Sequence, residues 1–407
     1  MHFRSLITAT AALASAANCL NILITNDDGF GVSNIREFYK AVKAFGHNAY
    51  IVASTSNQSG TGGTVVFTTA KNLTADTEFG IVKAGAPSVG TDPNDSHIWY
   101  YNGTPSACVQ VALDYILPTF ANVTTPDLVL SGPNYGWNLG PFLYTLSGTM
   151  GATYTAVERG IPAIAYSGGY SVQTPYFQVN STTAAGLKDP ATIAGQLSAN
   201  LAQQLILNAA ATGSKLMPVG YGISVNLPYI TSFTNSSCVD PPFIQTRMTS
   251  GADVDGAAYN ATSGLFTYKN IVDAGLNTCI NGDCSLPGET NILNAGCQSS
   301  VSVFAVDYDA PTSVCGQGSA TSSLRALLQP LVQDANSTNL IGGLNGTSAA
   351  PGTGNATATT GGGTSSSTGT LPPASTSAPV SSVAGPMVDF SWVAVAGGMM
   401  LGALWNR

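Results

Sequence analysis

Short apolar runs alternate with segments of helical periodicity along most of this chain. The apolar runs lie at residues 20–25, 49–53, 127–131, 162–167, 221–227 and 301–306. Apolar residues recur at helical spacing in the segments between them, most clearly in residues 33–46, 104–116, 151–159 and 192–211. Strands that alternate with amphipathic helices are typical of an α/β fold with crossover connections. We therefore predict a Rossmann-like, largely parallel sheet flanked by helices, in one domain over residues 18–330 with an irregular C-terminal extension.

Two helix starts are marked by polar residues. Ser33 precedes the first helical segment and is predicted to cap it, and Gly46 is predicted to end it. Thr104 is followed by Pro105, the order expected of an N-cap and the first helical residue. Cys108 lies on this second helix between Ala107 and Val109, so we expect it to be a buried free thiol.

The composition is unusual for a soluble domain. Hydrophobic residues make up 44% of the chain and charged residues only 8%, against roughly 25% charged residues in an average domain. Thirteen Lys and Arg against 21 Asp and Glu give a net charge of −8. This composition offers no basic surface for a phosphate backbone, so we do not expect nucleic-acid polymers as partners.

Both ends of the chain resemble processing signals. Residues 1–17 combine an apolar run with the small residues Ala14-Ser15-Ala16, which is the pattern of a secretory signal peptide. Residues 331–385 are rich in Ser, Thr and Gly and are predicted to form a disordered stalk. Residues 386–407 contain an apolar run that is shorter than the roughly 20 residues of a spanning helix, and they fit a GPI-attachment signal. A short single-pass anchor is the alternative for this segment.

Other features agree with secretion. Eleven N-x-S/T sequons begin at residues from Asn57 to Asn355, and each can carry a glycan if it lies on an accessible loop. The seven cysteines can form disulfides in an oxidising compartment, although their pairing cannot be deduced from the sequence. We therefore expect a glycoprotein at the cell surface or cell wall, attached to the membrane by a lipid anchor.

The first strand is followed by two adjacent carboxylates, Asp27 and Asp28, in the segment NDDGFG. Ligands of open parallel sheets bind beyond the carboxyl ends of the strands. The nearest basic residue along the chain is Arg36, so a divalent cation is the partner that could neutralise the pair. An N-D-D-G segment is also a common turn, and taken alone it leaves both readings open.

Further polar loops follow the neighbouring strands. The glycine-rich loop at residues 54–63 contains the hydroxyl of Ser59, and residues 131–140 read SGPNYGWNLG. The segment SGTMG at residues 147–151 opens a helix, and a helix N-terminus of small residues can bind an anion through its free N–H groups. Several such loops at one sheet edge predict a site for a metal ion and a phosphate group.

The order NDDG, NQSG, GTPSACV, SGPNYGWNLG and LSGTMGA resembles the SurE family of metal-dependent 5'/3'-nucleotidases and related acid phosphatases. Order and spacing agree over residues 20 to 170, and a weaker likeness continues to about residue 310. The resemblance implies that a divalent metal, Mg²⁺ or Mn²⁺, is held by Asp27, Asp28, Ser59 and Asn134. It also implies a dimer or tetramer of identical chains.

The same resemblance implies a phosphate-binding role for Asn138, Ser147, Gly148 and Thr149. This chain departs from the family pattern at two positions. Gln58 replaces an arginine that many members carry, and Ala107 replaces a common aspartate. If the missing arginine contacts phosphate in other members, its loss weakens substrate binding here.

The function implied is that of a secreted, metal-dependent phosphomonoesterase acting on small phosphate monoesters such as nucleoside monophosphates. Asp27 and Asp28 are the candidate catalytic residues, and one of them is expected to orient the attacking water. The sequence lacks the R-H-G-x-R motif of histidine phosphatases and the Cys-x₅-Arg motif of cysteine phosphatases. The alternative is a catalytically inactive cell-wall glycoprotein or a binding module for phosphorylated ligands.

Overall fold

The computed structural model describes residues 19–168, 172–230, 238–248, 254–272 and 282–309. The chain divides into two units, Met1–Asp334 and Ala335–Arg407, and the second lies wholly outside the described residues. The predicted signal peptide, stalk and C-terminal attachment signal also lie outside them. None of the described helices is both long and apolar enough to cross a membrane.

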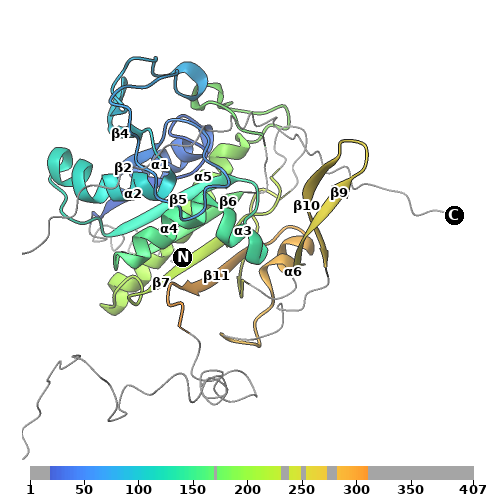
Figure 1. Ribbon diagram of the computed structural model, residues 1–407. Helices are drawn as coiled ribbons and strands as arrows, with labels where there is room; N and C mark the ends of the chain where they lie inside the picture. Colours follow the sequence, from blue (N-terminus) through green and yellow to red (C-terminus); the bar gives the residue numbers. More distant parts are fainter. Residues whose placement is uncertain (1–18, 169–171, 231–237, 249–253, 273–281, 310–407) are drawn as a thin grey trace, which may run out of the picture. The chain divides into compact units, whose positions relative to one another are not determined.

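A nine-stranded sheet forms the centre of the first unit (Figure 1). Across the sheet the strands are β3 (Val89–Asp92), β4 (Asp95–Tyr101), β2 (Asn48–Ser54), β1 (Asn21–Thr25), β5 (Leu128–Tyr135), β6 (Ala163–Gly168), β7 (Tyr221–Asn226), β11 (Ser299–Ala305) and β8 (Phe243–Thr246). A separate two-stranded sheet consists of β9 (Val254–Asn260) and β10 (Leu265–Val272).

The predicted parallel sheet is confirmed for its central strands. Strands β4, β2, β1, β5, β6 and β7 all run parallel to one another. The pairs β3–β4 and β7–β11 are antiparallel, so the sheet is mixed at both sides. The carboxyl ends of β2, β1 and β5 therefore lie side by side at one edge of the sheet.

Helices cover both faces of the sheet. On one face α1 (Ser33–Ala44) packs against α5 (Pro190–Thr212), and on the other α2 (Pro105–Val111) packs against α4 (Gly148–Glu158). The remaining helical segments are η2 (Glu78–Gly80), η3 (Ala112–Ala121), α3 (Gly140–Leu146), η4 (Tyr176–Gln178) and α6 (Glu289–Asn294).

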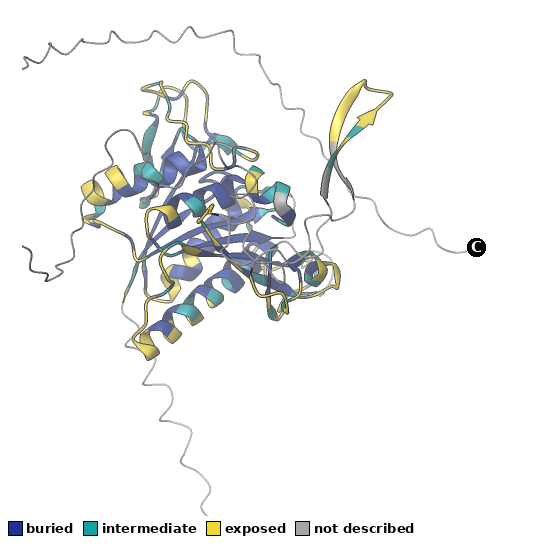
Figure 2. Cartoon of the chain, turned by 60° about the horizontal axis from the view of Figure 1, so that its bottom comes forward, coloured by how far each residue is buried: buried dark blue, intermediate teal, exposed yellow. Residues whose placement is uncertain are grey.

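Strand β1 contributes to both hydrophobic cores. Ile22 and Ile24 point into the core beneath α1 and α5, whereas Leu23 points into the core beneath α2 and α4. Figure 2 shows the central strands of the nine-stranded sheet as a buried layer between helices whose outer faces are exposed. A strand buried on both faces explains why residues 20–25 form a continuous apolar run rather than an alternating one.

One predicted helix cap is wrong, and a second is only partly right. Val32, not Ser33, occupies the N-cap position of α1. The Ser33 hydroxyl instead hydrogen-bonds with the Tyr135 hydroxyl at 2.6 Å and the Thr174 hydroxyl at 2.7 Å, because two neighbouring segments bring these partners close. Thr104 does precede α2, but its side chain donates to the carbonyl of Thr64 and makes no capping bond.

The cysteines of the described segments include one bonded pair that the sequence could not specify. Cys238 and Cys297 form a disulfide with their Cα atoms 5.3 Å apart. Cys108 is a buried free thiol, as predicted. Its burial raises the pKa of the thiol to about 12, so it stays protonated and unreactive at neutral pH.

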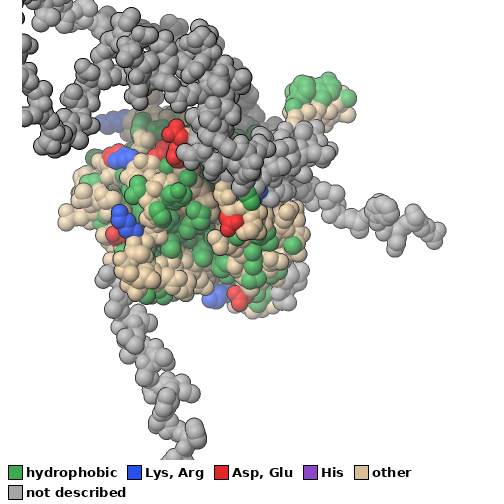
Figure 3. Space-filling view, turned by 90° about the horizontal axis from the view of Figure 1, so that it is seen from below, with side chains coloured by type: hydrophobic (Ala, Val, Ile, Leu, Met, Phe, Trp, Pro, Cys, Tyr) green, Lys and Arg blue, Asp and Glu red, His purple; other side chains and the backbone are tan. Residues whose placement is uncertain are grey.

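The surface reflects the low charge content. In Figure 3 the described surface is mostly hydrophobic and uncharged polar side chains, and the charged ones are scattered singly or in pairs. Two of the surface ion pairs are Lys83–Asp76 and Arg159–Asp114. Exposed pairs of this kind contribute little to stability, because water and salt screen their charges, so the stability of the domain depends on its apolar core.

The central strand provides a direct test of this core. Leu23 is completely buried, and replacing it with alanine should lower the free energy of unfolding by about 2–5 kcal/mol. Val303, in β11, is 55% exposed, and Val303→Ala should change it by less than about 0.5 kcal/mol. Urea unfolding of both variants measures the difference, and equal losses would contradict the assignment of β1 to the core.

Candidate active site

The two adjacent carboxylates lie at the carboxyl end of β1, at the edge of the sheet where β2 and β5 also end. Asp27 is 2% exposed and Asp28 is 1% exposed. The predicted meeting of the polar loops at this edge is confirmed, because the loops after β2 and β5 and the start of α4 all contact the pair. Each contact is described below.

Asp27 is held by the N-terminus of α4. The Thr149 hydroxyl donates to its Oδ1 at 2.7 Å. Burial raises the pKa of Asp27, and hydrogen bonds from the Thr149 side chain and from the backbone N–H groups of Thr149 and Gly148 oppose that rise. A Cβ at Gly148 would lie 2.8 Å from the Asp27 Cβ, so only glycine lets the helix approach this closely.

Asp28 is held from two other directions. Its Oδ2 accepts a hydrogen bond from the backbone N–H of Tyr135 at 3.2 Å, and its Oδ1 accepts one from the Gln173 side chain at 2.5 Å. Burial raises the pKa of Asp28 well above its ordinary value, and the negative charge of Asp27 raises it further. No described lysine or arginine forms an ion pair with either carboxylate.

Asn134 lies on β5, directly before the Tyr135 that contacts Asp28, and is 8% exposed. Its side-chain N–H donates to the carbonyl of Gly136 at 3.0 Å. Its Oδ1 is buried and has no hydrogen-bond partner. An unpaired buried oxygen is costly unless a ligand completes it, and amide and carboxylate oxygens are the ligands that Mg²⁺ and Mn²⁺ prefer.

This donor set fits a divalent metal. Among the residues that the structure describes, no three His, Cys, Asp or Glu side chains converge as direct ligands of an ion. An ion at this site would therefore need neutral oxygen ligands in addition to two carboxylates. Asp27, Asp28 and Asn134 provide two carboxylates and one neutral oxygen. Mg²⁺ usually keeps several waters beside one or two protein carboxylates, so the set is chemically sufficient.

The loop that carries Ser59 is fixed against this site through its backbone. The N–H of Gln58 donates to the carbonyl of Asp27 at 2.6 Å, and that of Gly62 donates to the carbonyl of Leu146 at 2.9 Å. A Cβ at Gly151 would lie 2.0 Å from the Gly62 carbonyl oxygen, so α4 and this loop pack backbone to backbone. Ser59 itself is exposed, and its role as a metal ligand stays a prediction.

Two predicted phosphate-binding residues have well-defined structural partners. Asn138 is buried, and its side-chain N–H donates to the Ser167 hydroxyl at 2.7 Å. Its backbone N–H donates to Asn226 Oδ1 at 2.9 Å. Ser147 is the N-cap of α4 and accepts a hydrogen bond from the N–H of Met150. These bonds fix Asn138 at the carboxyl ends of β6 and β7 and Ser147 at the start of α4, and the binding of phosphate by either residue stays a prediction.

Two further side chains at the site are absent from the predicted set. Gln173 lies in the segment after β6 and donates to Asp28. This segment is hydrogen-bonded to the start of α1, because the N–H of Ser33 donates to the carbonyl of Thr174 at 2.8 Å. Glu78 lies in η2, and burial raises its pKa to about 7. Neither residue lies in one of the glycine-rich polar motifs that the sequence singles out or in a periodic segment, so no local signal distinguishes them.

The family model of survival protein SurE matches residues 22–250 of this chain. The chain belongs to the SurE family. This confirms the resemblance seen in the sequence motifs. The matched residues contain both aspartates, Asn134 and the start of α4 described above.

Individual relatives agree with the family model. An acid phosphatase of Yarrowia lipolytica is 46% identical over 299 residues, which cover 73% of this chain and 82% of that protein. A 5'-nucleotidase SurE of Desulfovibrio desulfuricans is 39% identical over 149 residues, which cover 36% of this chain and about half (49%) of that protein. The crystal structure of a SurE protein from Aquifex aeolicus aligns with a TM-score of 0.49 and 19% identity, covering 76% of this chain and 98% of that one.

The raised pKa values predict how stability depends on pH when no metal is bound. Below the ordinary Asp pKa of 3.8, Asp28 is protonated in both the folded and the unfolded chain. As pH rises toward its raised folded pKa, only the unfolded chain releases the proton, so stability is lost. In EDTA the melting temperature of the parent should therefore fall as the pH rises above the ordinary Asp pKa of 3.8, and that of Asp28→Asn should fall less.

Glu289 is also buried with a pKa raised to about 8, but it contributes equally to the parent and the variant. The exposed Asp114, whose pKa is lowered by the hydrogen bond from Arg159, provides a control. Asp114→Asn should keep the full parental slope. If the melting temperatures of Asp28→Asn and Asp114→Asn depended on pH to the same extent, the raised pKa of Asp28 would be contradicted.

Proposed function

We propose that this SurE-family hydrolase is a secreted, metal-dependent phosphomonoesterase that cleaves small phosphate monoesters such as nucleoside monophosphates. Its relatives named acid phosphatase and 5'-nucleotidase support this reaction class. The observations that carry the metal dependence are the buried pair Asp27 and Asp28 and the unpaired, buried Oδ1 of Asn134, which precedes the Tyr135 that donates its N–H to Asp28. A negatively charged pair in this environment needs a positive partner.

Asp27, Asp28, Asn134 and Ser59 are the residues that would hold the cation. A divalent ion bound there would supply Lewis acidity to a phosphate oxygen and would lower the pKa of a water. Asp27 or Asp28 would accept a hydrogen bond from the attacking water and orient it toward phosphorus. Thr149 and the Tyr135 N–H fix the two carboxylates in place. The carboxylates are therefore already oriented toward the water before the reaction begins.

The start of α4 and the loop before α3 would bind the phosphate group. Residues 147–149 adjoin Asp27 through the hydrogen bond from Thr149, and Asn138 is held at the ends of β6 and β7 by Ser167 and Asn226. Helix N-terminal N–H groups stabilise negative charge as it develops on the phosphate oxygens. Gly148 and Thr149 face the Asp27 carboxylate in this structure, so substrate phosphate would share these donors with it.

We also propose that the chain is exported and attached to the cell surface. The support is the signal-like residues 1–17, the sequons and the low-charge, Ser/Thr/Gly-rich segment before residue 386. Several sequon asparagines are exposed, among them Asn72, Asn94 and Asn122. Exposed loop positions are where N-linked glycans can be accepted. A lipid attached near the end of the stalk would keep the domain at the membrane surface.

The metal dependence is tested by phosphate release from p-nitrophenyl phosphate and from nucleoside monophosphates, with Mg²⁺, with Mn²⁺ and with EDTA. Asp28→Asn should lower the rate by roughly 10²–10³-fold, equivalent to about 3–4 kcal/mol of barrier.

Asn134→Ala and Ser59→Ala should weaken metal binding more than the chemical step, so excess metal should partly restore their activity.

Asp114→Asn removes an exposed carboxylate and should keep the parental rate. A parental rate for Asp28→Asn in the presence of EDTA would mean that residues 26–29 are only a turn. Binding of nucleoside monophosphates without any phosphate release would instead favour the binding module.

The anchoring is tested on protein purified from cell membranes. Phospholipase C should release the full glycoprotein, because we expect residues 390–405 to be removed when the lipid is attached. Mass spectrometry of the mature protein should therefore find no peptide from that segment. Recovery of an intact 390–405 peptide would show that the lipid anchor is absent.

A further inference from the structure

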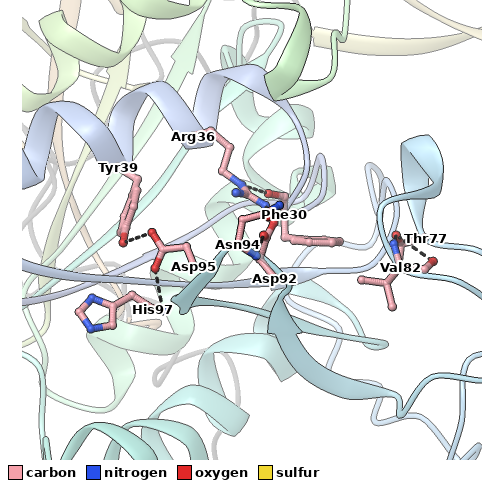
Figure 4. A network of polar contacts seen from close by, with 9 residues as sticks. All are labelled: Phe30, Arg36, Tyr39, Thr77, Val82, Asp92, Asn94, Asp95 and His97. Carbon is pink, nitrogen blue, oxygen red and sulfur yellow. Dashed lines mark hydrogen bonds and ion pairs between the residues drawn. The ribbon is translucent and has the colours of Figure 1, made fainter.

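The loop that carries Glu78 is built as a closed turn. The N–H of Thr77 donates to the carbonyl of Val82, and the N–H of Val82 donates back to the Thr77 hydroxyl, both at 2.9 Å (Figure 4). The N–H of Glu78 donates to the carbonyl of Thr55 in the loop after β2. Phe79, the next residue, has a φ of 59°, a strained conformation for a residue with a side chain. The position of Glu78 is therefore fixed by its backbone.

This turn packs directly on the segment that follows the aspartate pair. A Cβ at Gly29 would lie 3.0 Å from Glu78 Oε2, and one at Gly31 would lie 2.3 Å from Ile81 Cδ1. The two glycines on either side of Phe30 thus leave room for the turn. Figure 4 shows that Arg36 contacts the same segment through the Phe30 carbonyl at 2.6 Å and is paired with Asp92 of β3 at 2.5 Å.

The carboxylate of Glu78 accepts a hydrogen bond from the backbone N–H of Asn57, but no basic side chain is paired with it among the described ion pairs. Its Oε2 is buried without a hydrogen bond. Lys83 of the same loop is paired with Asp76 at 2.8 Å, and Arg36 is paired with Asp92. The charge of Glu78 also contributes to the raised pKa of Asp28, which shows that the two carboxylates interact. Because Glu78 adds its negative charge to that of the aspartate pair and no basic side chain offsets it, a cation at the pair would be favoured by all three charges.

We propose that Glu78 is a positioning residue of the cation site, a third carboxylate that strengthens divalent-cation binding through its charge. It acts from outside the direct ligand set, because no three acidic or other metal-binding side chains of the described residues converge on one point. The proposal rests on the proposed function, since it assumes that Asp27, Asp28 and Asn134 hold a divalent ion.

The test is a titration of the full-length, metal-stripped protein with Mn²⁺, in which free Mn²⁺ is measured by electron paramagnetic resonance. Glu78→Gln removes the charge but keeps the shape, and should weaken Mn²⁺ binding by about tenfold, because charge interactions persist over several ångströms at a buried site. Glu78→Asp keeps the charge and should restore most of the affinity.

Asp76→Asn is the matched control, because it removes one negative charge from the same loop at an exposed position paired with Lys83. Its Mn²⁺ affinity should stay within about twofold of the parent, since exposed charges are screened by water and salt. In EDTA, Glu78→Gln should melt at or above the parental temperature, because the variant relieves repulsion with Asp28.

The outcomes separate this inference from the proposed function. Equal affinities of Glu78→Gln and Asp76→Asn, with affinity lost only in Asp28→Asn, would overturn the role of Glu78 and leave the metal site intact. Weak binding by both Glu78→Gln and Glu78→Asp would show that the effect is one of shape, which also contradicts the proposal. A parent protein that binds no Mn²⁺ would overturn the proposed function together with this inference.

Discussion

The repulsion between two buried, adjacent carboxylates is the constraint around which this site is arranged. Asp27 and Asp28 are almost fully enclosed, and burial and mutual charge both disfavour their ionised forms. The protein supplies hydrogen-bond donors to them from α4, from β5 and from the segment after β6. None of the described ion pairs joins a basic side chain to either aspartate. A bound cation is therefore needed to neutralise their negative charge.

Close backbone packing makes that arrangement possible. Gly148 lets the start of α4 touch Asp27, and Gly151 lets the same helix lie on the loop that carries Ser59. Gly29 and Gly31 give space to the turn that carries Glu78. Because packed backbone cannot shift without disturbing several elements, the oxygen atoms at the sheet edge are held before any ligand binds.

The sequence predicted the features that depend on local patterns. The apolar run before Asp27 and the helical spacing after Ser33 identified β1 and α1, and the rule for parallel sheets placed the loops together at one edge. Ser33 was wrongly expected to cap α1, because its hydroxyl partners, Tyr135 and Thr174, are distant in the sequence. Glu78 and Gln173 reach the site through tertiary packing alone, so neither could be found from spacing. The antiparallel pairing of β11 with β7 likewise depends on contacts that no local pattern encodes.

The most direct test of this account is a crystal structure of the protein soaked with Mn²⁺, in which anomalous scattering locates the ion. The account predicts one strong peak at the carboxyl end of β1, within coordination distance of Asp27, Asp28 and Asn134 Oδ1. The same crystals of Asp28→Asn should lack that peak. An ion bound elsewhere, or a parent site that stays empty at saturating Mn²⁺ while the enzyme hydrolyses phosphate esters, would contradict it.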